Sequence, residues 1–186
     1  MLGLCWYAGA SENFLYVNDW NEVYDVYEYG TTSGWSPVFV NPSAEPRGMD
    51  MDDMQTIWEI EADSHTLYHF DLTGSVLGSF SLSELPGGYA CGCSVFPFAD
   101  GLGIVIGGYQ FPDFYFYNFD GSSLEYIGSE PVPQTASSSY GISYSANTDS
   151  FYWIYNDGSY NLCEFTVDFV ETSLEQSTWG DIKTTF

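Results

Sequence analysis

Residues 66–80, TLYHFDLTGSVLGSF, form two runs that alternate apolar and polar residues, joined by a turn that contains Asp71 and Gly74. Such alternation is typical of a half-buried strand, and Asp with Gly between two runs is typical of a hairpin turn. Similar stretches return downstream, as FYFYNFDGSSLEYIG at 114–128 and more loosely as YNLCEFTVDFVETSL at 160–174. A hairpin that recurs at long spacing predicts a repeat protein.

The rest of each unit repeats as well. GLCWYAGASENFLYVND at 3–19 aligns without a gap on GISYSANTDSFYWIYND at 141–157, and weaker copies begin at Gly48 and Gly92. From Gly3 to Gly141, the four repeat glycines are therefore 45, 44 and 49 residues apart. Each unit offers a short strand after its glycine, a strongly apolar strand, an aromatic alternating strand and a final strand. Four strands in about 40–50 residues is the pattern of a β-propeller blade.

We therefore predict an all-β protein, a β-propeller of four four-stranded blades. The predicted blades are approximately 3–47, 48–91, 92–140 and 141–178, and residues 179–186 form a C-terminal tail. No window shows sustained helical periodicity. A β-sandwich is the main alternative, although its strands need not recur at a fixed long period.

Charge excludes several classes of partner. The chain has 26 Asp and Glu residues against 2 Lys and Arg, for a net formal charge of −24. Two cations cannot build a basic patch, so we expect neither nucleic acid nor an anionic membrane surface as a partner. The longest apolar stretches are well short of the ~20 residues that span a bilayer, so we expect no membrane insertion. Carboxylates inside apolar strands, as in TIWEIEAD, are expected to face water or a cation, because buried unpaired carboxylates are costly.

The four cysteines, Cys5, Cys91, Cys93 and Cys163, are sparse. Their spacing lacks the second pair and the histidines of a zinc site. Small buried residues and a disulfide both remain open.

These units resemble the repeats of β-propellers in secreted or cell-surface bacterial proteins, in the style of NHL and strictosidine-synthase-like propellers. The residues that carry the resemblance are Gly48, Ile57, Trp58, Leu67, Tyr68, Phe70, Asp71, Gly74, Leu77, Ser79 and Phe80, and then Phe114, Tyr115, Phe116, Tyr117, Phe119, Asp120 and Gly121. The resemblance implies a propeller fold and suggests export; it implies no activity. Such propellers usually have six or more blades, so this chain is either complete with four, part of a larger propeller, or completed by association.

Catalytic propellers similar to this group hydrolyse lactones or esters with a metal ion held near the pore. Asp50, Asp52 and Asp53 in GMDMDDM are the candidate ligands here, since carboxylate oxygens suit Ca²⁺. The alternative is a set of solvated acids, because the unit that begins at Gly92 offers no matching acid. His65 and His69 are expected at the surface, away from the pore. No Ser–His–Asp triad is visible, and apart from a possible Ca²⁺ we expect no cofactor.

The aromatic residues divide into two groups. Trp58 and Trp153 occupy matching apolar strands and are expected in the core. Trp20 and Trp35 lie in loop-like segments and are candidates for contact with a partner or a glycan. Trp179 and Phe186, in the tail, are expected to dock against the first blade or a neighbouring subunit.

The sequence thus favours a non-enzymatic, extracellular or cell-surface module for protein interaction, with self-assembly into a homo-oligomer. Open first and last blade edges recruit partners unless they are blocked, and the Lys residues that often block them are almost absent. A carbohydrate-binding, lectin-like propeller is the main alternative, and a Ca-dependent lactonase or esterase is a weaker one.

Overall fold

The computed structural model describes residues 4–8, 12–18, 25–99, 101–136 and 138–168. These residues form fifteen strands: β1 (Leu4–Ala8), β2 (Asn13–Asn18), β3 (Asp25–Gly30), β4 (Gly34–Val40), β5 (Pro46–Met51), β6 (Ile57–Glu61), β7 (Thr66–Phe70), β8 (Val76–Ser81), β9 (Ala90–Phe98), β10 (Gly101–Gly108), β11 (Asp113–Phe119), β12 (Leu124–Pro131), β13 (Ser138–Ser145), β14 (Ser150–Asn156) and β15 (Tyr160–Phe165). In the described part of the chain, no helix is long and apolar enough to cross a membrane.

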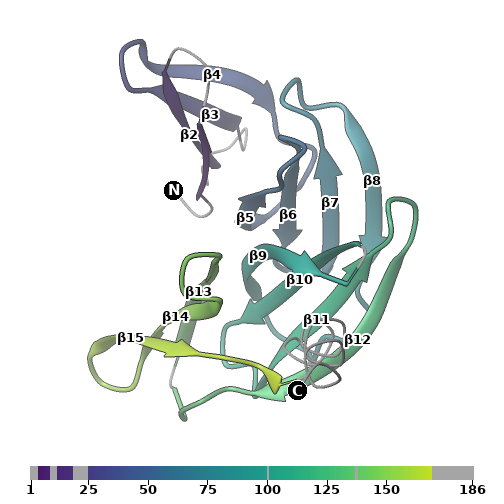
Figure 1. Cartoon of the computed structure of the whole chain (residues 1–186), viewed down its shortest axis with the longest axis vertical. Helices are drawn as coiled ribbons and strands as arrows, with labels where there is room; N and C mark the ends of the chain where they lie inside the picture. The colour runs from purple at the N-terminus through teal and green to yellow at the C-terminus, as the bar shows by residue number, and fades with distance from the viewer. Residues whose placement is uncertain (1–3, 9–11, 19–24, 100, 137, 169–186) are drawn as a thin grey trace, which may run out of the picture.

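The strands form four antiparallel sheets, each a simple meander in chain order: β1–β4, β5–β8, β9–β12 and β13–β15. The sheets follow one another along an arc, and β5, β9 and β13 lie toward its inside while β8 and β12 lie toward its outside (Figure 1). This is the predicted four-bladed β-propeller arrangement, with the first and fourth sheets at the two ends of the arc (Figure 1). The fourth sheet has three strands in the described residues, and its predicted last strand, at 171–176, lies outside them.

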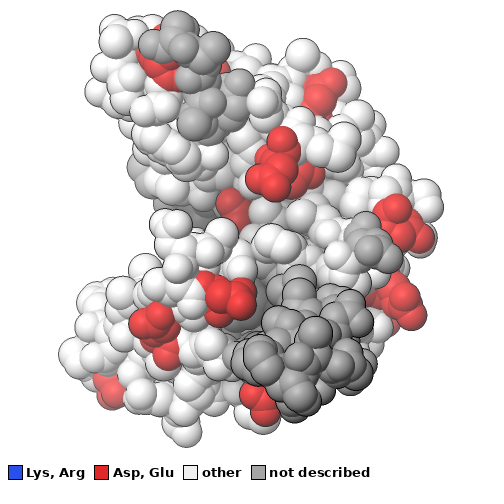
Figure 2. All heavy atoms as spheres, in the orientation of Figure 1, with Lys and Arg blue, Asp and Glu red and all other residues white. Residues whose placement is uncertain are grey.

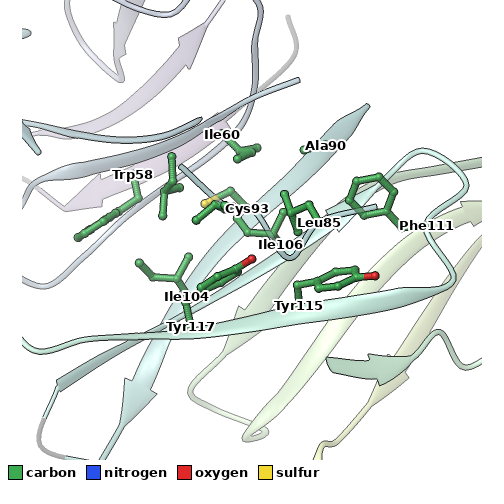
Figure 3. Close-up of a cluster of buried hydrophobic side chains, with 12 residues drawn as sticks. Trp58, Ile60, Leu85, Ala90, Cys93, Ile104, Ile106, Phe111, Tyr115 and Tyr117 are labelled. Atoms are coloured by element: carbon green, nitrogen blue, oxygen red, sulfur yellow. The ribbon is translucent and has the colours of Figure 1, made fainter. Parts of the chain in front are cut away.

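Each pair of neighbouring blades shares one apolar core. The first core joins Cys5, Tyr16 and Val26 of the first blade to Met49, Ile57 and Phe70 of the second. The second core lies between the second and third blades, and Figure 3 shows Trp58 and Ile60 packed toward Cys93, Ile104 and Ile106. The third core joins Phe96, Val105, Phe114 and Phe116 to Ile142, Phe151, Trp153 and Tyr155. Trp58 and Trp153 are fully buried, as predicted from the sequence.

The repeat glycines mark the closest approach between blades. A Cβ atom on Gly48 of β5 would lie 2.4 Å from the backbone nitrogen of Cys93 on β9. A Cβ atom on Gly92 of β9 would lie 3.0 Å from Ile142 on β13. Glycine lets two backbones pack this closely, which explains its place at Gly48 and Gly92, whereas a Cβ atom on Gly141 would meet nothing within 4 Å.

The hairpin turns follow the predicted chemistry. Gly74 has φ +85° and Gly121 has φ +96°, a region where glycine carries no Cβ penalty. The Asp71 carboxylate accepts hydrogen bonds from the backbone N–H groups of Thr73 and Ser75, and Asp120 accepts similar bonds two and three residues on. The aspartate therefore fixes the turn through its own backbone.

Candidate functional site: the open faces of the first and last blades

The first blade has one buried face and one open face. On β1, the Cys5 side chain is buried toward the second blade, while Leu4 and Trp6 on either side of it point the opposite way and are exposed. Side chains alternate along a strand, so one register defines the whole open face. Trp6 pairs with Leu15, Leu15 with Tyr29, and Tyr29 with Trp35, which gives one row across all four strands.

This row is rich in exposed aromatic surface. Trp6 is 53% exposed and Trp35 is 56% exposed. The Trp35 ring lies against that of Tyr29, with 4.9 Å between the ring centroids. The structure thus places Trp35 on the open face of the first blade, in β4 rather than in a loop. Its role as a contact residue stays a prediction.

The fourth blade has the complementary arrangement. Trp153 and Tyr155 of β14 are buried against the third blade, and Ile154 between them is exposed on the other face. Ile154 pairs with Leu162 of β15, which is 64% exposed. Beside them, the exposed rings of Tyr140 and Tyr160 lie 5.8 Å apart.

Faces equivalent to these two are buried where neighbouring blades meet. In each of the three cores, one face of a blade packs against the opposite face of the blade that follows it in the chain. The open face of the fourth blade and that of the first are the two faces left over in this succession. Exposed rows of large apolar side chains on monomers usually mark an interaction surface. Figure 2 shows acidic side chains scattered over the molecule, with no Lys or Arg among the described atoms in view.

The other predicted contact residues are outside the described part of the chain. Trp20 lies in 19–24, and Trp179 and Phe186 lie in 169–186. The predicted docking of the tail therefore stays a prediction.

Asp50 has a structural role between blades. Its carboxylate accepts hydrogen bonds from Ser94 Oγ at 2.7 Å and from the Val95 backbone N–H at 3.0 Å, both on β9. Ser94 Oγ in turn accepts a hydrogen bond from the Tyr144 backbone N–H on β13. Burial raises the pKa of Asp50, and the bonds from Ser94, Val95 and Met51 oppose that rise. This chain of bonds ties the inner strands of three blades together.

This connection between blades was not predicted from the sequence, although a signal for it exists. Asp50 and Ser94 each stand two residues after a repeat glycine, at Gly48 and Gly92. Matching polar residues at matching positions of neighbouring inner strands indicate contact around the axis of a propeller.

The predicted calcium ligands have separate surroundings. Asp52 accepts hydrogen bonds within its own blade, from Thr56 and from the Trp58 ring nitrogen. Asp53 is exposed and has no hydrogen-bond partner among the described residues. Within the described ranges, no group of three or more His, Cys, Asp or Glu side chains is placed to hold a metal ion. The four cysteines are all free thiols, and burial raises the pKa of Cys5 and Cys93 well above the usual value.

One prediction about carboxylates was wrong. Glu59 in TIWEIEAD is fully buried between the first and second blades, rather than facing water. Its Oε2 atom accepts hydrogen bonds from the amides of Asn18 at 2.7 Å and Asn41 at 2.8 Å, while Oε1 has no partner among the described residues. Burial raises the pKa of Glu59 to about 7, with the two amides acting in the opposite direction. In its protonated form the carboxyl group avoids the cost of a buried charge.

The expected position of His69 was also wrong. Its side chain is only 12% exposed, and its ring stacks on Trp58 with 3.9 Å between the ring centroids. Alternation along β7 correctly predicted that His69 and Tyr68 point to opposite faces of the strand. The face that carries His69, however, packs toward the third blade. His65 lies in the β6–β7 turn, where Nε2 is 2.7 Å from the Gly88 carbonyl oxygen.

Comparison with known proteins supports the fold and goes no further. No protein-family model matches the chain, and no curated protein matches it in sequence. Among solved structures, it is similar to a streptogramin B lyase (TM-score 0.55, 11% identity, covering 89% of this chain and 54% of the other). It is also similar to a protein of unknown function from Bacteroides thetaiotaomicron (TM-score 0.61, 14% identity, 90% and 41%) and to a luciferin-regenerating enzyme (TM-score 0.58, 14% identity, 83% and 58%). This chain therefore spans about half the length of the structures that it matches.

Proposed function

We propose that this chain is a non-enzymatic protein-interaction and self-assembly module that binds further blades on the open faces of its first and fourth sheets. The observation that supports it is the pair of exposed apolar rows, one at each end of the arc. Full burial of a large apolar side chain contributes roughly 1.5–3 kcal/mol. Several such residues on each face are enough to offset the cost of association.

The partner is a second copy of the chain. The first blade of one copy packs on the fourth blade of the other copy. This contact repeats the way in which neighbouring blades already pack within one chain. Two copies related by a two-fold axis make this contact twice and close a ring. The similar structures are longer than this chain, which covers 54% of one and 58% of another, and this is consistent with a propeller of more than four blades.

Association depends on salt in a predictable direction. The net formal charge of −24 makes copies repel one another at low ionic strength. At about 1 M salt the Debye length is about 3 Å, so the repulsion is screened while apolar burial remains. Size-exclusion chromatography with light scattering should show larger species at high salt than at low salt. A monomer under both conditions contradicts self-assembly.

Substitutions on the two faces test where the contact lies. Trp6→Glu and Leu162→Glu each place a charge in an apolar row and should each return the assembly to monomers. Met54→Glu is the matched control, because Met54 is 83% exposed but lies in the β5–β6 turn, away from both rows. If all three variants assemble equally well, the open faces are not the interface.

The proposed location is outside the cell or at its surface, on the resemblance of the repeats to secreted and cell-surface propellers. Immunodetection on intact cells, compared with lysed cells, tests it. Signal only after lysis contradicts this location.

A carbohydrate-binding function is the second candidate, and one observation favours it. Trp35 and Tyr29 form an exposed pair of rings, the kind of platform on which a sugar can stack. A glycan array followed by Trp35→Ala on any hit separates the candidates. A hit that Trp35→Ala abolishes supports the lectin, and an array without hits counts against it.

A further inference from the structure

A groove of about 690 Å³ lies between the second and third blades, apart from the two open faces. It lies at the end of the blades that carries the β5–β6 and β11–β12 turns. Phe80, Leu102 and Phe119 supply apolar walls, and His69, Asp53 and Asp120 also line it. Its volume is in the range of small-molecule sites, which are mostly apolar with a few placed polar groups.

The hydrogen bonds beneath the groove fix which nitrogen of His69 carries the hydrogen. The Asp52 carboxylate accepts from the Thr56 hydroxyl at 2.6 Å and from the Trp58 ring N–H at 3.0 Å. Because the Thr56 hydrogen points to Asp52, Thr56 Oγ1 can only accept at its second contact. That contact is His69 Nε2, 2.6 Å away, so Nε2 carries the hydrogen.

His69 therefore offers a lone pair on its other ring nitrogen. Burial lowers the pKa of His69, with the Asp52 charge acting in the opposite direction, which favours the neutral ring. Nδ1 has no hydrogen-bond partner among the described residues, and it is not fully buried. The ring is held between Trp58, stacked at 3.9 Å, and Phe119, edge-on at 5.6 Å. A rigid acceptor thus stands in an aromatic setting.

The charged residues around the groove favour a ligand with a positive charge. Asp52, Asp53 and Asp120 all line the groove, and neither Lys nor Arg is among its lining residues. Backbone hydrogen bonds from Ser123 and Ser122 lower the pKa of Asp120, so it stays ionised. An anion would meet three carboxylates and no cation. A cation would meet carboxylates, aromatic rings and a nitrogen lone pair, all of which attract it.

We propose that this groove binds a small organic cation, an ammonium group on an aromatic or aliphatic body. The ammonium donates a hydrogen bond to His69 Nδ1, and its body packs against Phe80 and Phe119. The Asp53 carboxylate, free of protein partners among the described residues, adds a long-range attraction at the rim.

Three probes of similar shape test the proposal on the intact chain: phenethylammonium, the neutral 2-phenylethanol and the anionic phenylacetate. Calorimetry should show binding in that order of affinity, with phenylacetate the weakest. The chain has two histidines, so the ring signals of His69 in an NMR spectrum are assigned by their loss in His69→Phe. Those signals should move on addition of phenethylammonium. Equal binding of the three probes, or no binding of phenethylammonium, overturns the proposal.

Matched variants separate the groove from the general acidity of the chain. His69→Phe keeps a ring on Trp58 and removes the acceptor, and it should weaken phenethylammonium binding about tenfold or more. Asp53→Asn should weaken it by about two- to fivefold, as for an exposed charge. Asp63→Asn removes the same charge from the β6–β7 turn at the other end of the blade and should have no effect. If Asp63→Asn weakens binding as much as Asp53→Asn does, only net charge attracts the probe, and the proposal fails.

Discussion

Replacing Glu59 with Gln removes a carboxyl group that is fully buried between the first and second blades. Glutamine has the same shape and can still accept hydrogen bonds from Asn18 and Asn41, so it mimics the protonated acid. The rise in the pKa of Glu59 from 4.5 to about 7 corresponds to about 3 kcal/mol of differential interaction, because each pKa unit is about 1.4 kcal/mol.

The direction in which Glu59 changes the free energy of unfolding with pH follows from which state, folded or unfolded, binds its proton more tightly. Between pH 4.5 and about 7, Glu59 is protonated in the folded state and ionised in the unfolded state. The unfolded state binds fewer protons there, so the contribution of Glu59 to the free energy of unfolding is largest below pH 4.5 and is lost as the pH rises through 7. The raised pKa of Asp50 acts in the same direction. The lowered pKa of His69 acts in the opposite direction below about 6.5. Both are present in wild type and variant, so the difference between the two isolates Glu59.

Urea unfolding followed by tryptophan fluorescence measures this difference at about pH 5 and about pH 8. Glu59→Gln should be more stable than the wild type by about 1 kcal/mol or less at the lower pH and by up to about 3 kcal/mol at the higher one. Glu125→Gln is the control, because Glu125 is exposed on β12, and it should follow the wild type throughout. If the stability difference between wild type and Glu59→Gln does not change with pH, the buried carboxyl does not titrate in this range, contrary to the prediction.

Three further predictions concern packing and the tail. Gly48→Ala should destabilise the fold by roughly 1–3 kcal/mol, because its Cβ would meet the backbone of β9, whereas Gly87→Ala has open space and should be near neutral in the same thermal melt. Ser94→Ala removes a donor to the buried Asp50 and should cost about 1–3 kcal/mol in urea unfolding; an unchanged midpoint would mean that the bond between blades is not stabilising. Deleting residues 177–186 should lower the melting temperature or reduce assembly, and a truncated chain unchanged in both would show that the tail is only a linker.

The sequence predicts the fold because the information is local. Alternation along β7 and β8, the Asp–Gly turn at Asp71 and Gly74, and the return of both at a near-constant spacing require no knowledge of distant contacts. The repeat glycines were also visible, and the close approach of neighbouring inner strands gives the physical reason for Gly48 and Gly92, though not for Gly141.

The environment of single polar residues could not be predicted in the same way. Burial of Glu59 depends on Asn18 and Asn41, which lie 41 and 18 residues away and meet it only when the blades pack. His69 looked exposed because alternation tells which residues share a face, but not which face meets the next blade. Its stacking on Trp58 follows from the pairing of β6 with β7 inside one blade, whereas its contact with Phe119 depends on how the second and third blades are arranged.

Mixing two variants, each with one cysteine added to the four native free thiols, tests the head-to-tail assembly most directly. Trp6→Cys places a thiol on the open face of the first blade, and Ile154→Cys places one on the open face of the fourth. When the two proteins carry different tags and are oxidised together at high salt, we expect a disulfide-linked species that contains both tags, beyond the level that either variant gives with wild type. Disulfide dimers of Trp6→Cys alone would indicate that first blades meet each other. The absence of any mixed species would contradict the packing of one copy's first blade on its neighbour's fourth.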